Sequence, residues 1–156
     1  MILELREEHL RAIRESGERS YPYECCGLLL GRTIAGGKVL VEVWETENAW
    51  DGESARSFVS DSDTSNDFTQ ERRYTIAPET MFAAQRSARE RQLDIIGIYH
   101  SHPNHPAVPS ECDRLWAWQQ YSYIIASVRN GKTIDIRSWQ LDGDRQFQPE
   151  ELRICG

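Results

Sequence analysis

Apolar residues along this chain gather in short runs rich in β-branched and aromatic side chains, separated by glycine, proline and asparagine. Runs of this kind predict β-strands. The predicted strands cover residues 1–5, 24–32, 38–47, 73–77, 95–103, 121–129, 132–141 and 151–154. Gly36-Gly37 and Asn130-Gly131 predict tight hairpin turns, because such residues tolerate positive φ angles. The first and last strands are short, and we expect both to lie at sheet edges.

Apolar residues recur at helical spacing in three further segments. The first covers residues 6–20, where His9 falls among charged neighbours and is therefore expected to be exposed. The second begins at Pro78, because proline is tolerated in the first turn of a helix. The third begins after Ser110, whose side chain suits the N-cap position.

These elements predict an α+β fold, in which a single mixed, mostly antiparallel β-sheet is flanked by three helices. A chain of 156 residues can bury a core of its own, so we expect one domain over residues 1–156. Residues 48–72 are polar and lack periodicity, which predicts a long loop. Phe58 and Phe68 are the only phenylalanines in that loop, and they could anchor it to the domain or to a partner.

The charge of the chain argues against nucleic acid as a partner. The formal net charge is -7, and the basic residues do not cluster enough to follow a phosphate backbone. No stretch approaches the roughly 20 apolar residues of a membrane-spanning helix, and the amino-terminal residues do not resemble a secretory signal. We therefore expect a soluble cytoplasmic protein that binds neither nucleic acid nor a membrane.

The cysteines fit a reducing compartment. Cys25 and Cys26 are adjacent and should point to opposite faces of a strand, while Cys112 and Cys155 lie elsewhere. No Cys-x-x-Cys zinc ribbon can be drawn from this spacing. We expect reduced, mostly buried thiols, and a nucleophilic role for Cys112 is disfavoured because it would need an adjacent base.

Two histidines leave the strand at 95–103 two residues apart. Because side chains alternate along a strand, His100 and His102 point to one side and Ser101 to the other. Three prolines stiffen the turn that follows, and this turn can bring Asp113 back toward the histidines. Two imidazoles and one carboxylate suit zinc and leave its fourth position for water, which is the pattern of a catalytic site.

Each part of this pattern also has a simpler interpretation. A single histidine at a strand end is commonly surface or core filler, and Ser110 followed by Asp113 matches a helix capping box. Neither explains two histidines on one face followed by a stiffened return to a carboxylate. We therefore predict that His100, His102 and Asp113 bind the metal and that His105 does not.

The order His100-Ser101-His102-Pro103, then Ser110 after six residues and Asp113 after two more, resembles the signature of the JAMM (MPN-type) zinc metallopeptidases. The resemblance covers about residues 21–141 and implies a cytidine-deaminase-like architecture. It also implies a glutamate on an upstream strand, which Glu24 in the segment YPYECCGLLLGR matches. Without the histidines, Glu24 would be read as the charged first residue of a strand.

Members of this family cut peptide or isopeptide bonds after ubiquitin-like C-termini, so the resemblance implies a zinc peptidase or isopeptidase. Glu24 would be the general base and Ser110 an oxyanion donor, although the N-cap role competes for the Ser110 hydroxyl. Members that cleave ubiquitin chains typically carry an insertion after the metal-bearing helix, whereas here Gln120 runs straight into a strand. This favours the compact prokaryotic members and a ubiquitin-like sulfur-carrier protein with a Gly-Gly tail as partner.

Two functions of other classes fit the same residues. A non-catalytic binding module of the MPN type would keep the fold, but such modules usually lack a ligand or the glutamate, and both are present here. A zinc hydrolase of small amides would use the same centre without a protein partner.

Overall fold

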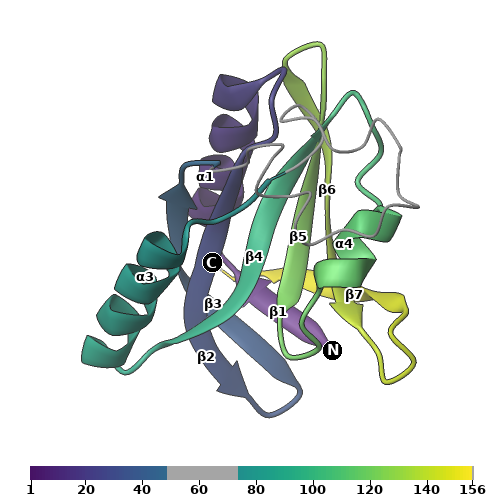
Figure 1. The fold of residues 1–156 in the computed structure, drawn as a ribbon. Helices are drawn as coiled ribbons and strands as arrows, with labels where there is room; N and C mark the ends of the chain where they lie inside the picture. Colours follow the sequence, from purple (N-terminus) through teal and green to yellow (C-terminus); the bar gives the residue numbers. More distant parts are fainter. Residues whose placement is uncertain (49–73, 156) are drawn as a thin grey trace.

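The structure, a computed structural model, describes residues 1–48 and 74–155 (Figure 1). Within these residues the chain forms seven strands and three helices. In chain order these are β1 (Ile2–Leu5), α1 (Glu7–Ser20), β2 (Cys26–Ile34), β3 (Gly37–Thr46), α3 (Pro78–Glu90), β4 (Asp94–Pro103), α4 (Glu111–Trp116), β5 (Ser122–Arg129), β6 (Lys132–Leu141) and β7 (Phe147–Ile154). Each matches a predicted element, and most ends differ by about one or two residues.

Two local predictions need correction. β7 begins at Phe147 rather than at residue 151. The strand predicted at 73–77 is wrong over residues 74–77, which form no strand. Residue 73 and the two phenylalanines of the predicted loop, Phe58 and Phe68, lie outside the described residues.

The described strands close into a barrel in the order β1-β3-β2-β4-β5-β6-β7. The expectation of a sheet with β1 and β7 at its edges, flanked by helices, is therefore wrong. β1 pairs in parallel with β3 on one side and with β7 on the other, so the two predicted edges form the closing seam. The physical reason is that the twist of a many-stranded sheet brings its ends together, and mutual pairing removes both unpaired edges.

α1 completes the wall where the closing strands are short. β1 pairs with β3 only over Gly37–Val39, and β7 pairs with β6 only over Ser138–Leu141. In the remaining gap α1 contacts both β3 and β6. The Glu18 carboxylate accepts the backbone N–H of Thr133 on β6 at 2.7 Å, and Arg19 pairs with Glu45 on β3 at 2.8 Å. The helix thus bonds to backbone groups of β3 and β6 that β1 and β7 do not reach, while its buried Ile13 joins the core cluster of the barrel.

His9 belongs to this junction and is buried, so its predicted exposure is wrong. Its Nδ1 accepts the backbone N–H of Arg6 at 3.0 Å, and its Nε2 lies 3.1 Å from the carbonyl oxygen of Val41 on β3. Because a carbonyl only accepts, the proton of the neutral ring is on Nε2. The imidazole caps the start of α1 and supplies a donor to the strand beside it.

α3 covers the outside of β2 and β4. Its buried residues Ala84 and Ala88 belong to one apolar cluster with Leu28, Leu30 and Ile98. In the view of Figure 1, α3 lies to the left of β4 and α4 lies to its right. Within the part of the chain that the structure describes, no helix is long and apolar enough to cross a membrane.

Candidate metal centre and its pocket

The sheet register brings Glu24 beside the two histidines of β4. β4 lies between β2, with which it is antiparallel, and β5, with which it is parallel; His100 is opposite Cys26 and Ile125. Continuing the β2 register two residues toward the amino end places Glu24 opposite His102. Glu24 precedes β2 instead of starting it, and only 4% of its surface is exposed.

The side chains of His100, His102 and Asp113 meet at one point. Their candidate ligand atoms all lie within 4.8 Å of one another. The two Nε2 atoms are 3.1 Å apart, and the Asp113 oxygens lie 3.3 Å from Nε2 of His100 and 3.2 Å from Nε2 of His102. All three residues are buried. The structure thus confirms that these three side chains converge, as the sequence predicted.

The donor chemistry of this cluster fits a cation. Nδ1 of His102 lies 2.9 Å from the carbonyl oxygen of Pro106 and must carry the proton, because a carbonyl only accepts. In the neutral ring Nε2 then has no proton, and its lone pair faces an Asp113 oxygen that lies 3.2 Å from Nε2. Two acceptors this close repel each other unless a proton or a cation lies between them. Metal-binding histidines are commonly oriented in this way, with the second nitrogen bonded to a backbone carbonyl.

Asp113 is held by the start of α4. Its backbone N–H donates to the Ser110 hydroxyl oxygen at 3.0 Å, and its carboxylate accepts the Ser110 backbone N–H at 2.8 Å. The capping box predicted as an alternative therefore exists. Burial by itself would raise the pKa of Asp113, but when a proton lies between the imidazoles and the carboxylate, His100 and then His102 outweigh burial and hold that pKa well below its usual value. The carboxylate is ionised, which is the form that binds metals.

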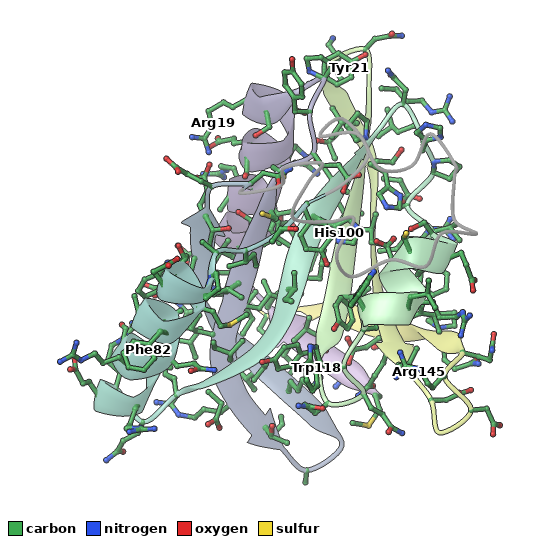
Figure 2. The ribbon with its side chains drawn as sticks, viewed as in Figure 1. Arg19, Tyr21, Phe82, His100, Trp118 and Arg145 are labelled. Atoms are coloured by element: carbon green, nitrogen blue, oxygen red, sulfur yellow. The ribbon has the colours of Figure 1, made fainter. Side chains whose placement is uncertain are left out.

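The turn between β6 and β7 holds the other end of α4. The Arg145 guanidinium donates to the carbonyl oxygens of Arg114 at 2.8 Å and of Ala117 at 3.4 Å, near the end of the helix (Figure 2). A helix of six residues is marginal alone. Contacts at both ends therefore keep Asp113 in place.

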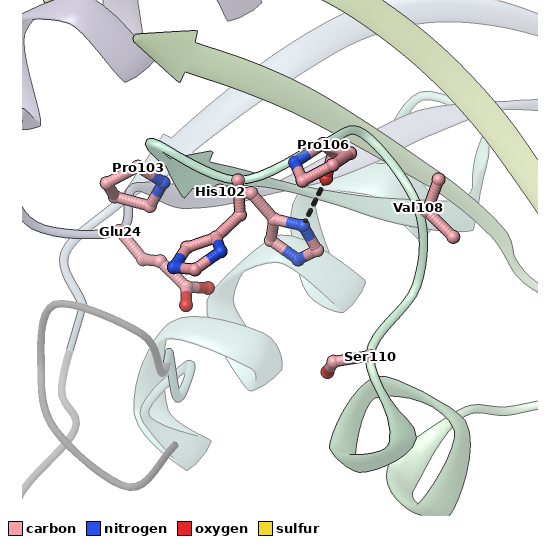
Figure 3. Close-up of a pocket in the computed structure, with 7 residues that line it drawn as sticks. Glu24, His102, Pro103, Pro106, Val108 and Ser110 are labelled. Carbon is pink, nitrogen blue, oxygen red and sulfur yellow. Dashed lines mark hydrogen bonds between the residues drawn. The ribbon is translucent and has the colours of Figure 1, made fainter. Parts of the chain in front are cut away.

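A pocket of about 400 Å³ opens beside this cluster (Figure 3). Its lining residues are Glu24, His102, Pro103, His105, Pro106, Val108 and Ser110. Glu24 and Ser110 lie on different sides of the pocket with His102 between them. The structure therefore brings all five predicted site residues to one place. His105 lines the pocket but does not belong to the cluster of His100, His102 and Asp113 that could hold a metal.

Two residues at this site were missed by the sequence analysis. The ring of Tyr74 stacks on that of His100, with ring centroids 4.5 Å apart. Burial raises the pKa of Tyr74 well above its usual value, so the phenol is neutral at physiological pH. The Asn48 side chain joins the Glu24 backbone to that of Thr75. For Asn48 the only signal in the sequence is its position after a predicted strand, and for Tyr74 the predicted strand at 73–77 gives no sign of a site residue.

Comparison with known proteins adds a family and a fold. The family described as prokaryotic homologs of the JAB domain matches residues 6–142. A protein of Haloferax volcanii named Desampylase is 29% identical over 149 residues, which cover 94% of this chain and 91% of that protein.

Solved structures extend the comparison. A Salinibacter ruber protein, 32% identical, superposes with a TM-score of 0.69 and covers 97% of this chain and 91% of its own. A JAB1/MPN domain protein of Archaeoglobus fulgidus is 15% identical with a TM-score of 0.55, and the match covers 100% of this chain and 98% of that one. At that identity the likeness shows a common fold.

Proposed function

This chain belongs to the prokaryotic JAB family of JAMM/MPN proteins, and from that premise we propose that it is a zinc-dependent isopeptidase acting on a ubiquitin-like carrier protein. One observation carries the proposal: the ligand atoms of His100, His102 and Asp113 meet within 4.8 Å, beside a pocket lined by Glu24 and Ser110. The Haloferax relative named Desampylase supports an isopeptidase of this kind.

Two imidazoles and a carboxylate suit zinc, and with three protein ligands zinc keeps a position open. Held there, it would polarise the scissile carbonyl and lower the pKa of a water molecule toward neutrality. His100, His102 and Asp113 would supply the three ligands. The Pro106 carbonyl keeps the Nε2 lone pair of His102 directed at the centre.

Glu24 would serve as the general base. Its carboxylate lines the pocket next to His102, where it can take a proton from the attacking water and pass it to the departing amine. The bond that breaks is the amide after the last glycine of the carrier, and the water oxygen becomes part of the new carboxylate. Burial keeps this carboxylate away from bulk water.

Ser110 would donate its hydroxyl proton to the developing oxyanion. Its hydroxyl oxygen already accepts the Asp113 N–H as a helix cap. A hydroxyl has one donor and two acceptor sites, so capping leaves the donor available. The N-cap role therefore uses the hydroxyl as an acceptor, and the oxyanion role uses it as a donor. A hydrogen bond to the oxyanion is worth about 3 kcal/mol in other hydrolases.

The substrate tail would lie against Pro103, Pro106 and Val108, which line the pocket. A Gly-Gly end suits this entrance, since residues without a Cβ need the least room. The test is a ubiquitin-like carrier carrying a short extension after Gly-Gly, incubated with zinc-loaded protein and followed by intact mass spectrometry. We expect one new C-terminus at the last glycine, with faster cleavage of the folded carrier than of its isolated tail because the carrier body adds binding energy.

A carrier whose last glycine is replaced by leucine is the matched control and should not be cut. Cleavage at scattered sites, or equal rates on carrier and free tail, would favour a small-amide hydrolase. Binding of the carrier without cleavage by the zinc-loaded protein would favour a non-catalytic binding module.

A further inference from the structure

The ring of Tyr74 lies nearly flat on the ring of His100. The centroids are 4.5 Å apart and the planes differ by 23°. Tyr74 lies four residues before α3 and packs against the apolar cluster that α3 forms with β2 and β4. His100 is completely buried. The tyrosine ring is therefore a fixed wall against one face of this imidazole.

The stacked tyrosine ring can fix the plane of the His100 imidazole. The last torsion of a histidine side chain is broad and roughly two-fold, so the strand fixes the position of the ring but not its plane. The direction of Nε2, 3.1 Å from Nε2 of His102, depends on that plane. For His102 the Pro106 carbonyl sets the ring, and for His100 the stacked tyrosine can do the same.

Asn48 holds the backbone next to the tyrosine. Its Nδ2 donates to the carbonyl oxygen of Glu24 at 3.1 Å, and its Oδ1 accepts the N–H of Thr75 at 3.1 Å. The Asn48 side chain thus connects Thr75, the residue after Tyr74, with Glu24, the candidate base. Loss of the Asn48 side chain would free the backbone at Glu24 and at Thr75 together.

We propose that Tyr74 is a positioning residue that sets the ring plane of His100, and that Asn48 holds the Tyr74 segment against the Glu24 backbone. The inference rests on the proposed metal centre. It assigns no chemistry to the phenol, so the aromatic ring is the part that matters and the hydroxyl is dispensable.

The test is zinc affinity, measured by competition with a chromophoric chelator. We expect Tyr74→Leu, which keeps apolar volume but loses the stack, to weaken zinc binding about 10- to 100-fold, as loss of a residue that orients a ligand typically does. Tyr74→Phe keeps the ring and should bind within about twofold of the wild type. Phe82→Leu is the matched control, because Phe82 is 66% exposed on α3 and points away from the barrel (Figure 2).

A merely structural role would lower the unfolding midpoint of metal-free Tyr74→Leu and leave the affinity of its folded form unchanged. That result, or equal losses in Tyr74→Leu and Tyr74→Phe, would overturn the proposal. Asn48→Ala should weaken zinc binding in the same direction as Tyr74→Leu.

A second measurement does not depend on any variant or on zinc. In the metal-free wild type, NMR should show contacts between the ring protons of Tyr74 and His100, and their absence would also overturn the proposal. A protein that binds zinc with the expected Tyr74 dependence but cuts no carrier would refute the proposed function and leave this inference standing.

Discussion

Glu24 and Ser110 reach the pocket from two different chain segments, each held by backbone contacts. Asn48 bonds the carbonyl of Glu24, and the capping box fixes Ser110. Both side chains therefore present their functional groups from fixed backbone rather than from a free loop. Such preorganisation is what proton transfer and oxyanion stabilisation require.

Glu24→Gln tests the proposed general base separately from the proposed metal centre. The amide keeps the size and much of the hydrogen bonding of the carboxylate but cannot accept a proton from water. We expect a folded protein that binds zinc normally and cuts the carrier about 10²-fold more slowly or worse, which is the usual cost of losing a general base. Single-turnover cleavage by the zinc-loaded variant is the measurement, and near-normal turnover would exclude this role.

At the residue scale, alternation along one strand was enough to predict that His100 and His102 share a face, and the prolines and Ser110 indicated the return of Asp113. The neighbours that orient these residues were not predictable. Tyr74 contacts His100 from residues 74–77, which were predicted as a strand but form none, so the predicted pairing gave no sign of this contact. The Pro106 carbonyl is a backbone atom, and its contact with His102 has no sequence signature.

α1 works as a structural part of the barrel wall. It bonds to β3 through His9 and to β6 through Glu18, at the strand edges that β1 and β7 do not reach. Exposed strand edges invite pairing with other chains. Covering them with a helix closes the molecule where strand pairing ends.

His9→Ala tests this role of the helix. It removes the donor to the Val41 carbonyl and the acceptor of the Arg6 N–H. Arg6 and Val41 are themselves exposed, so water can take the place of the lost partners. An ordinary hydrogen bond contributes about 0.5–1.5 kcal/mol net, and we expect a loss of that order for each bond in the free energy of unfolding. Urea unfolding of the metal-free protein measures it. Arg11→Ala, an exposed change on the same helix, should alter stability little; equal effects in both variants would show that His9 is not a special contact.

At the element scale, hydrophobic periodicity predicted most strands and helices but not the start of β7. Glu150 is buried there, accepting a hydrogen bond from Ser138 at 2.8 Å. Lys38 is buried on β3 and donates to Ser122 at 2.8 Å. Such polar residues inside the wall interrupt the alternation that marks a strand, and hydrophobic pattern alone cannot identify partners so far apart along the chain.

Burial also sets the reactivity of the cysteine thiols. Cys25, Cys26 and Cys112 are buried, as expected, whereas Cys155 is exposed near the end of the chain. Burial raises the pKa of Cys26 to about 12, and burial raises that of Cys25 as well. Both thiols are therefore protonated and unreactive at neutral pH.

Alkylation of the folded protein by iodoacetamide at pH 8 should modify Cys155 alone. The nucleophile is the thiolate, and pH 8 is far below the pKa of about 12 at Cys26. Denaturant should expose the other thiols and allow all four to react. Peptide mass spectrometry identifies the modified sites, and rapid native modification of Cys25 or Cys26 would show that the barrel opens.

Elemental analysis of freshly purified protein shows whether the proposed metal centre exists. We expect about one zinc per chain, lost in each of His100→Ala, His102→Ala and Asp113→Ala. Zinc should remain in His105→Ala, because His105 lines the pocket without joining the cluster. A protein that takes up no zinc, or one that loses it in His105→Ala and keeps it in His102→Ala, would show that these three residues are not its zinc ligands.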